Sequence, residues 1–282
     1  MKYKYLLFDL DGTLTDPMEG ITTSVQYALK AFGIEEPDLE KLAPFIGPPL
    51  RESFMRLYGF DEAQAEEAVA KYREWFAPKG IFQNTIYPGI REMLEELKTK
   101  GKILAVASSK PQVFVEKILR HFGIYDYFTV IVGSELDGTR DRKEEVVEEA
   151  LRRLWKSGGE DSADEVCMTD GKGLADGAHM TDGEVLTDGA HMTDGEGLTD
   201  EAHMTDGEGL MDEAHMTDGE DSADRAHTVM TGDRKYDIEG GKAHGLVTVG
   251  VSFGYAGDGE LESTGADYLV DTVEELRRLL AQ

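Results

Sequence analysis

The amino-acid sequence predicts an α/β protein: a Rossmann-like parallel sheet with helices on both faces, plus a small all-helical cap domain inserted after the first strand. Short apolar runs alternate with amphipathic helical patterns over residues 84–156 and 228–282, as in proteins with a parallel sheet. Residues 17–83 show helical patterns and no convincing strand. Polar side chains directly follow several predicted strands, and this is where ligands bind in such sheets.

The first strand and the cap helices follow from local patterns. Residues 3–13 are a short apolar run that ends in carboxylates and glycine, which indicates a buried strand with polar residues at its carboxyl end. A helical pattern then runs from Glu19 to Gly33, with its apolar residues on one face and glycine at its end. Pro48-Pro49 and Asp61 are typical starts for two further helices.

The remaining elements alternate between helix and strand. The predicted helices cover residues 88–101, 111–123, 142–154, 235–245 and 272–280, and the predicted strands cover residues 102–109, 127–133, 228–233, 246–251 and 267–270. The predicted domain segments are core 1–16, cap 17–83, core 84–156, an acidic insertion 157–227 and core 228–282.

The insertion is a tandem repeat with a step of twelve residues. The sequence MTDG begins at residues 168, 180, 192, 204 and 216, and histidine recurs with the same step. The spacing differs from that of an EF-hand loop, which argues against a metal-binding array. One apolar residue in six cannot bury a continuous core, which argues against a solenoid. We therefore expect an acidic, low-complexity, disordered loop that interrupts one ordinary connection.

Charge and composition exclude several classes of partner. The chain of 282 residues carries a formal net charge of −28, most of it in the repeat, and this disfavours nucleic acid and anionic membranes as partners. Cys167 is the single cysteine, so no intrachain disulfide forms. The apolar run before Asp9 is too short for a signal segment. We expect a cytoplasmic protein, a monomer or weak dimer, whose partner is a small molecule.

The polar residues at the predicted strand ends form a constellation with phosphoryl-transfer chemistry. Several carboxylates in one cleft repel one another and raise each other's pKa values, and Mg²⁺, which prefers oxygen ligands and pairs with phosphate, relieves that repulsion. One aspartate can attack phosphorus, while a second moves the proton. A lysine and a strand-end serine can hold the phosphoryl oxygens. The candidate residues are Asp9, Asp11, Ser108, Ser109, Lys143, Asp233 and Asp237.

These residues lie in four motifs that resemble, in order, those of the haloacid dehalogenase (HAD) superfamily. The motifs are DLDGT (9–13), AVASSK (105–110), the lysine of RDRK (140–143) and GDRKYD (232–237). The resemblance implies that Asp9 is the nucleophile and Asp11 the general acid and base, with its backbone carbonyl on the metal. It also implies that Lys143 and Ser108, with the adjacent Ser109, hold phosphate. Mg²⁺ would be bound by Asp233, supported by Asp237, together with Asp9 and Asp11.

Within the superfamily the chain is similar to phosphoglycolate phosphatases and to bacterial 5′-nucleotidase-like members. FIGPPLRESF (45–54), SSKP (108–111) and ELDGTR (135–140) carry this similarity. It implies hydrolysis of a nucleoside 5′-monophosphate or of 2-phosphoglycolate, with Mg²⁺ as cofactor. The cap residues Gly47, Pro48 and Arg51 are candidates for substrate selection, and Arg51 could equally lie in solvent.

Two other functions stay open. A phosphomutase of the same family would return the phosphoryl group to a sugar instead of to water. A non-catalytic acidic binding protein, built on an inactive phosphatase, belongs to another class. The intact carboxylates and lysine of the four motifs argue against the second alternative.

Overall fold

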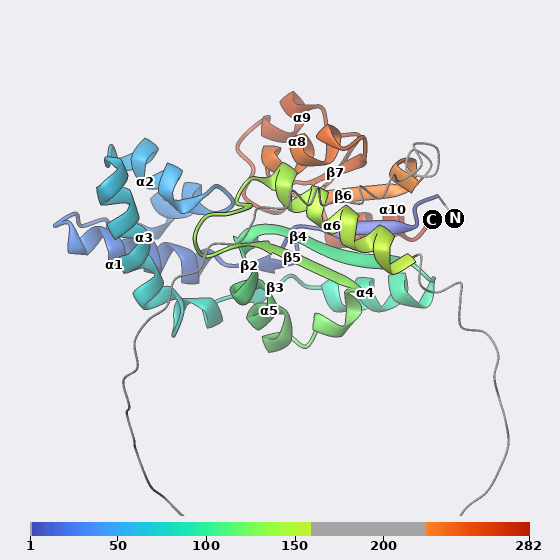
Figure 1. Ribbon diagram of the computed structural model, residues 1–282, viewed down its shortest axis with the longest axis horizontal. Helices are drawn as coiled ribbons and strands as arrows, with labels where there is room; N and C mark the ends of the chain where they lie inside the picture. The colour runs from blue at the N-terminus through green and yellow to red at the C-terminus, as the bar shows by residue number, and fades with distance from the viewer. Residues whose placement is uncertain (1, 159–223) are drawn as a thin grey trace, which may run out of the picture. The chain divides into compact units, whose positions relative to one another are not determined.

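A computed structural model describes residues 2–158 and 224–282, with the side chains of residues 156–158 excepted (Figure 1). Its central feature is a sheet of six parallel strands in the order β5-β4-β1-β6-β7-β8. The strands are β1 (Tyr5–Phe8), β4 (Ile103–Pro111), β5 (Val130–Ser134), β6 (Thr228–Gly232), β7 (Val247–Val251) and β8 (Tyr268–Val270). The predicted parallel α/β fold is confirmed.

Helices cover both faces of this sheet. The helices of the core are α4 (Ile90–Thr99), α5 (Gln112–His121), η3 (Tyr125–Tyr127), α6 (Lys143–Gly158), α8 (Lys235–Ala243), α9 (Glu260–Thr264) and α10 (Val273–Leu280). Figure 1 shows α6 and α8 on one side of the sheet and α4 and α5 on the other.

Alternation along β1 explains why both faces are covered. Tyr5 and Leu7 belong to the apolar cluster that includes the buried side chains of α6, whereas Leu6 and Phe8 belong to the cluster on the opposite face. All four side chains are buried, because successive residues of a strand point to opposite faces and each face meets helices. An uninterrupted apolar run is therefore the expected signature of this central strand.

The cap is helical, as predicted. It contains α1 (Met18–Ala31), η1 (Leu39–Phe45), α2 (Leu50–Tyr58), α3 (Glu62–Phe76) and η2 (Gly80–Phe82). Asp61 caps α3 by accepting from the Gln64 backbone N–H at 2.8 Å, and the Gln64 side chain accepts from the Asp61 backbone N–H. Pro49 precedes the first residue of α2, also as predicted.

Several short elements escaped the sequence analysis, among them η1, η3, α9 and the strands β2 (Thr15–Asp16) and β3 (Thr85–Ile86). The 3₁₀ helix η1 contains Pro44, and it has no helical periodicity long enough to detect. The strands β2 and β3 pair antiparallel over two residues each. Their pairing brings the two connections between core and cap side by side, so the chain enters and leaves the cap at one place.

The acidic repeat lies largely outside the described residues. Residues 157–158 complete α6, and residues 224–226 are helical and directly precede β6. The expectation of disorder concerns the part between them, which the structure does not describe. Across the described ranges, none of the helices combines the length and the apolar character needed to span a bilayer.

Candidate active site

The carboxyl ends of β1 and β6 place two aspartates side by side. The two strands pair in parallel with Phe8 opposite Thr231, and the backbone N–H of Asp9 donates to the Thr231 carbonyl at 2.9 Å. Asp9 and Asp233, the first residues beyond Phe8 and Gly232, are both buried. With Asp237, from the first turn of α8, they form a group in which each residue offers one carboxylate oxygen, and these three oxygens lie within 4.8 Å of one another.

Lys143, the first residue of α6, faces this group from the side. Its ammonium lies 2.8 Å from Asp9 Oδ1 and 2.7 Å from Asp237 Oδ1, and it donates to the Ala107 carbonyl at 3.1 Å. Burial alone would lower the pKa of Lys143, but the charges of Asp237 and Asp9 outweigh it and raise the pKa above its ordinary value. Lys143 is therefore a permanent cation that holds the Asp9 carboxylate.

One lysine does not balance three buried carboxylates. Burial, together with the charges of Asp237 and Asp9, raises the pKa of Asp233 well above its ordinary value. Burial raises the pKa of Asp237 to about 6, although Lys143 opposes the shift. Asp233 Oδ1 is buried and has no hydrogen-bond partner among the described residues. A divalent cation fits this group, because it would supply the missing positive charge and accept the free oxygen as a ligand.

Two glycines permit the close packing of these carboxylates. Gly12 has φ +82°, and a Cβ there would lie 2.1 Å from Asp233 Oδ2. A Cβ at Gly232 would lie 2.0 Å from Asp237 Cγ. Side chains at these two positions would displace the carboxylates, so both motifs need glycine.

Asp11 lies apart from the three clustered carboxylates. Its carboxylate is buried and pairs with the ammonium of Lys110, which is also buried. Burial raises the pKa of Asp11, while the charge of Lys110 opposes the rise. The Lys110 ammonium also lies 4.9 Å from the ring centre of Phe76, on the last turn of the cap helix α3. Asp11 thus faces the cap rather than the metal-binding group.

Ser108 and Ser109 belong to β4, the neighbour of β1. Ser108 is buried, and its Oγ accepts from the Lys110 backbone N–H at 3.4 Å. The Ser109 carbonyl accepts from Ser134 Oγ, on β5, at 2.8 Å. Both serines line the same cavity as Asp9 and Asp11.

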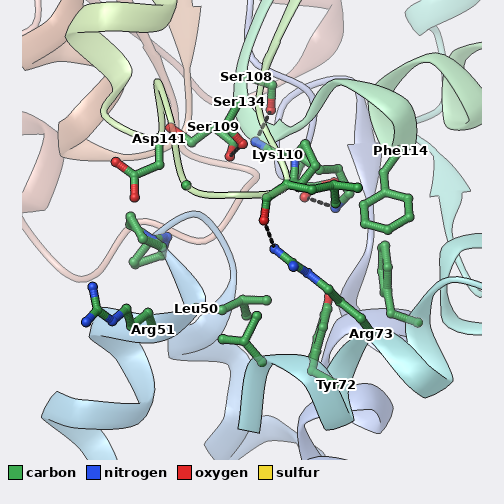
Figure 2. Close-up of a pocket in the computed structure, with 18 of the residues that line it drawn as sticks. Leu50, Arg51, Tyr72, Arg73, Ser108, Ser109, Lys110, Phe114, Ser134 and Asp141 are labelled. Atoms are coloured by element: carbon green, nitrogen blue, oxygen red, sulfur yellow. Dashed lines mark hydrogen bonds and ion pairs between the residues drawn. The ribbon is translucent and has the colours of Figure 1, made fainter. Parts of the chain in front are cut away.

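The cavity lies between core and cap and has a volume of about 290 Å³ (Figure 2). Gly47, Pro48 and Arg51, which the sequence proposed for substrate selection, all line it. Arg51 Nε lies 3.1 Å from Glu66 Oε1, and the Arg51 side chain is 47% exposed. Of the residues predicted from the sequence, Lys143, Asp233 and Asp237 lie behind Asp9 and do not line the cavity.

The structure adds contacts that sequence reasoning missed. Lys110 was part of a recognised motif but received no role, although its place directly after two serines was a usable signal. Tyr255 donates its backbone N–H to Asp233 Oδ2 at 2.7 Å and its hydroxyl to Asp16 on β2. Arg234 donates to the Ile46 carbonyl of the cap and lies 3.0 Å from Glu260. Nothing in the local sequence of Tyr255 or Arg234 indicates these partners.

Comparison with known proteins is consistent with this geometry. A family model described as haloacid dehalogenase-like hydrolase matches residues 6–168, and one described as HAD-hydrolase-like matches residues 207–276. A 5′-nucleotidase from Pseudomonas aeruginosa is 56% identical over 151 residues, which are 54% of this chain and 68% of that protein.

Two further relatives align over nearly the whole chain. The tyrosine-protein kinase PtkA of Mycobacterium tuberculosis is 30% identical over 277 residues, which are 98% of this chain and 72% of that protein. The crystal structure of a predicted phosphatase from Clostridium acetobutylicum has a TM-score of 0.73 and 36% identity, with 99% of each chain covered. The resemblance carried by the four motifs is confirmed: the chain is a phosphatase that belongs to the haloacid dehalogenase-like hydrolase family.

Proposed function

We propose that this phosphatase is Mg²⁺-dependent and hydrolyses a small phosphate monoester through an aspartyl-phosphate on Asp9. The observation that carries the proposal is the position of Asp9. Its carboxylate lines the cavity, while Lys143, at 2.8 Å, fixes one of its oxygens. The second carboxylate on the cavity side, Asp11, lies two residues further along the chain.

In the first half of the reaction an Asp9 oxygen attacks phosphorus, and the bond between phosphorus and the ester oxygen breaks. Asp11 delivers a proton to the departing oxygen, so that an alcohol leaves instead of an alkoxide. The Ser108 hydroxyl, which lines the cavity, donates to a phosphoryl oxygen. Lys143 keeps the Asp9 carboxylate oriented for the attack.

In the second half the acyl phosphate on Asp9 is hydrolysed. Asp11, now deprotonated, takes a proton from water as the water oxygen attacks phosphorus. The bond between phosphorus and the Asp9 oxygen breaks, and the carboxylate and inorganic phosphate are released. One acid–base residue thus serves both halves in opposite directions.

Asp9, Asp233 and Asp237, with the backbone carbonyl of Asp11, would hold the Mg²⁺ ion. When bound, the ion neutralises the carboxylates and the phosphate charge, which allows two anions to approach each other. Asp233 Oδ1, which is buried and meets no hydrogen-bond partner in the described ranges, supports this role.

The proposed substrates are a nucleoside 5′-monophosphate and 2-phosphoglycolate. Release of inorganic phosphate from a panel of phosphate esters, with Mg²⁺ and then after exhaustive chelation, tests the proposal. We expect phosphate release with Mg²⁺ and no release after chelation. Ca²⁺, which is larger and less strict in its coordination geometry, should inhibit the enzyme or fail to replace Mg²⁺. Turnover by chelated, metal-free protein would contradict the metal role. Isomerisation of hexose phosphates without phosphate release would identify a mutase instead.

A further inference from the structure

Two arginines of the cap line the cavity, and their surroundings differ. Arg51, on α2, lies 3.1 Å from Glu66 and 3.6 Å from Glu62, both on α3. Arg73, also on α3, donates through Nη2 to the Leu136 carbonyl at 2.9 Å. Among the described residues no carboxylate lies within 4.0 Å of the Arg73 guanidinium, and its other nitrogens have no hydrogen-bond partner. Within the described part of the chain, Arg73 is therefore a cation with no carboxylate paired to it.

The acidic residues that line the cavity are engaged elsewhere. Glu66 pairs with Arg51, and Glu135 pairs with Arg140. Asp137 accepts from the Thr139 backbone N–H at 2.9 Å. Burial raises the pKa of Asp141, and the nearby cations that lower it are Arg142 and Arg51. None of these carboxylates forms an ion pair with Arg73.

An apolar wall connects Arg73 with the reacting groups. The rings of Tyr72 and Phe76 are stacked with their centres 5.1 Å apart, and Phe114 packs edge-on against Phe76 at 5.3 Å. Lys110, which pairs with Asp11, lies against the same Phe76 ring. Arg73 precedes Phe76 by three residues, about 4.5 Å along the helix axis. A leaving group a few atoms long would thus extend from Asp11 along the rings toward Arg73.

The position of the guanidinium suits a ligand. Figure 2 shows Arg73 extending from α3 into the middle of the cavity, toward the loop that holds Leu136, while Arg51 lies at the margin of the view. The Arg73 side chain is half-buried, and a partly desolvated cation is costly unless an anion meets it. The bond to Leu136 fixes the planar group and leaves its remaining N–H donors for a two-oxygen acceptor.

We propose that Arg73 binds an anionic group on the leaving part of the substrate, a carboxylate or a second phosphate, and thereby determines which esters the enzyme selects. The proposal rests on the phosphatase activity proposed above and narrows its substrate class. It favours esters such as 2-phosphoglycolate over nucleoside monophosphates, whose leaving group is neutral.

Matched substrates test the proposal. 2-Phosphoglycolate carries a carboxylate where ethyl phosphate carries a methyl group. Ethane-1,2-diol bisphosphate carries a second phosphate instead. Adenosine 5′-monophosphate has a larger, neutral leaving group. We expect Arg73→Gln to lower kcat/KM for one or both anion-bearing esters by about 10- to 100-fold. Ethyl phosphate and adenosine monophosphate should change by less than about threefold. The larger loss identifies the carboxylate or the phosphate as the anion.

Two further variants separate recognition from structure. Arg73→Lys keeps the charge but loses the planar fork, so it should recover part of the selectivity. Arg56→Gln removes an exposed cap arginine that does not line the cavity, and its kinetics should match the parent. An equal loss on all four substrates with Arg73→Gln would show that the contact with Leu136 only holds the cap, and it would overturn the proposal. A carboxylate-selective loss in Arg51→Gln, with Arg73→Gln unaffected, would also overturn it.

A binding measurement keeps this proposal distinct from the proposed function. In an Asp9→Asn background, titration calorimetry compares 2-phosphoglycolate, the bisphosphate and ethyl phosphate, with and without Arg73→Gln. If Arg73→Gln weakens the binding of an anion-bearing ester but not that of ethyl phosphate, the role of Arg73 is supported, even if the enzyme turns over none of the esters. Absent turnover would contradict only the proposed function. If Arg73→Gln leaves the affinity for each of the three esters unchanged, the role of Arg73 is contradicted.

Discussion

The cavity has a core wall, which includes Asp9, Asp11, Ser108 and Ser109, and a cap wall, which includes Arg51, Tyr72, Arg73 and Phe76. We count Lys143, Asp233 and Asp237, which lie behind Asp9, with the core wall. The charged groups of the two walls are compensated in different ways. In the core wall, Lys143 lies 2.7–2.8 Å from two carboxylates, and the three side chains are only 1–6% exposed. On the cap wall, Arg51 meets Glu62 and Glu66 at 3.6 and 3.1 Å, with the three side chains 47–79% exposed. Removal of one partner from a buried pair costs about 3–5 kcal/mol. An exposed pair contributes about 0–1 kcal/mol.

This difference separates two kinds of function. The core wall is fixed by strand ends in a paired sheet, so its carboxylates keep their positions whatever ester is bound. The cap wall presents, beside buried rings such as Tyr72 and Phe76, exposed side chains such as Arg51 and Glu66 that can be exchanged at little cost to folding. Changes in the core wall should therefore affect all esters with a similar leaving-group pKa alike, and changes in the cap wall should separate such esters by the shape and charge of their leaving groups.

Asp9→Asn is the strongest test of the core wall. The substitution removes the attacking carboxylate and a metal ligand with almost no change of volume. We expect kcat to fall by at least about 10³-fold on every ester. The thermal midpoint should stay close to that of the parent, because Lys143 keeps its pair with Asp237 and the amide relieves the repulsion among the clustered carboxylates. The control is Asp126→Asn, an exposed aspartate on η3, which should leave kcat unchanged. Retained turnover above a few per cent would refute Asp9 as the nucleophile.

Asp11→Asn should have a smaller effect that depends on the leaving group. The amide cannot deliver a proton, so kcat for an alkyl ester should fall by about 10²- to 10⁴-fold. With p-nitrophenyl phosphate, whose leaving group needs no proton, the rate of the first half of the reaction should fall less. Burst kinetics with this ester would separate the two halves. Full activity toward an alkyl ester would refute the proton-transfer role.

The residues of the core wall could be predicted from the sequence, because the carboxyl ends of the strands of a parallel sheet meet at one edge. Asp9, Ser108 and Asp233 each follow from a short apolar run and the polar residue at its end. Contacts between core and cap were not accessible, because they depend on how two helical faces meet. Arg73 lies in an ordinary amphipathic helix, and no local pattern distinguishes it from the exposed Arg56.

The core wall also predicts how pH and Mg²⁺ affect stability. A carboxyl whose pKa is raised by folding stabilises the protein fully below its unfolded pKa, and this contribution is lost as the pH rises through the folded value. For Asp237, whose pKa burial raises to about 6, the loss occurs as the pH rises toward and through about 6. Metal-free protein should therefore gain more from added Mg²⁺ at about pH 7.5 than at about pH 5.

Thermal melts with chelator and with Mg²⁺ at both pH values measure this effect. We expect Mg²⁺ to raise the midpoint at the higher pH by at least about 3 °C more than at the lower pH. Asp233→Asn serves as the matched variant, because it removes one carboxylate without changing volume. The thermal midpoint of this variant without metal should fall less between the lower and the higher pH, and added Mg²⁺ should raise it less than in the parent. An equal response to Mg²⁺ at both pH values would argue against a metal site among these carboxylates.

The acidic repeat belongs to neither wall, and its removal should have the smallest effect. Helix α6 begins at Lys143 in the site and ends at Gly158, about 22 Å further along its axis. The next described strand, β6, starts at Thr228 beside Tyr5, the end of β1 opposite Asp9. The connection thus leaves and re-enters the core at the edge of the sheet away from the catalytic carboxylates.

Deletion of residues 159–218 joins Gly158 to Gly219 and keeps one copy of the GEDSAD sequence. The cost of closing a loop grows only with the logarithm of its length, so the shorter chain should fold with kcat and Mg²⁺ dependence within about threefold of the parent. A second variant that lacks only residues 180–191, one repeat unit, should behave the same way. Loss of turnover in the long deletion, with an unchanged thermal midpoint, would show that the repeat acts on one of the two walls.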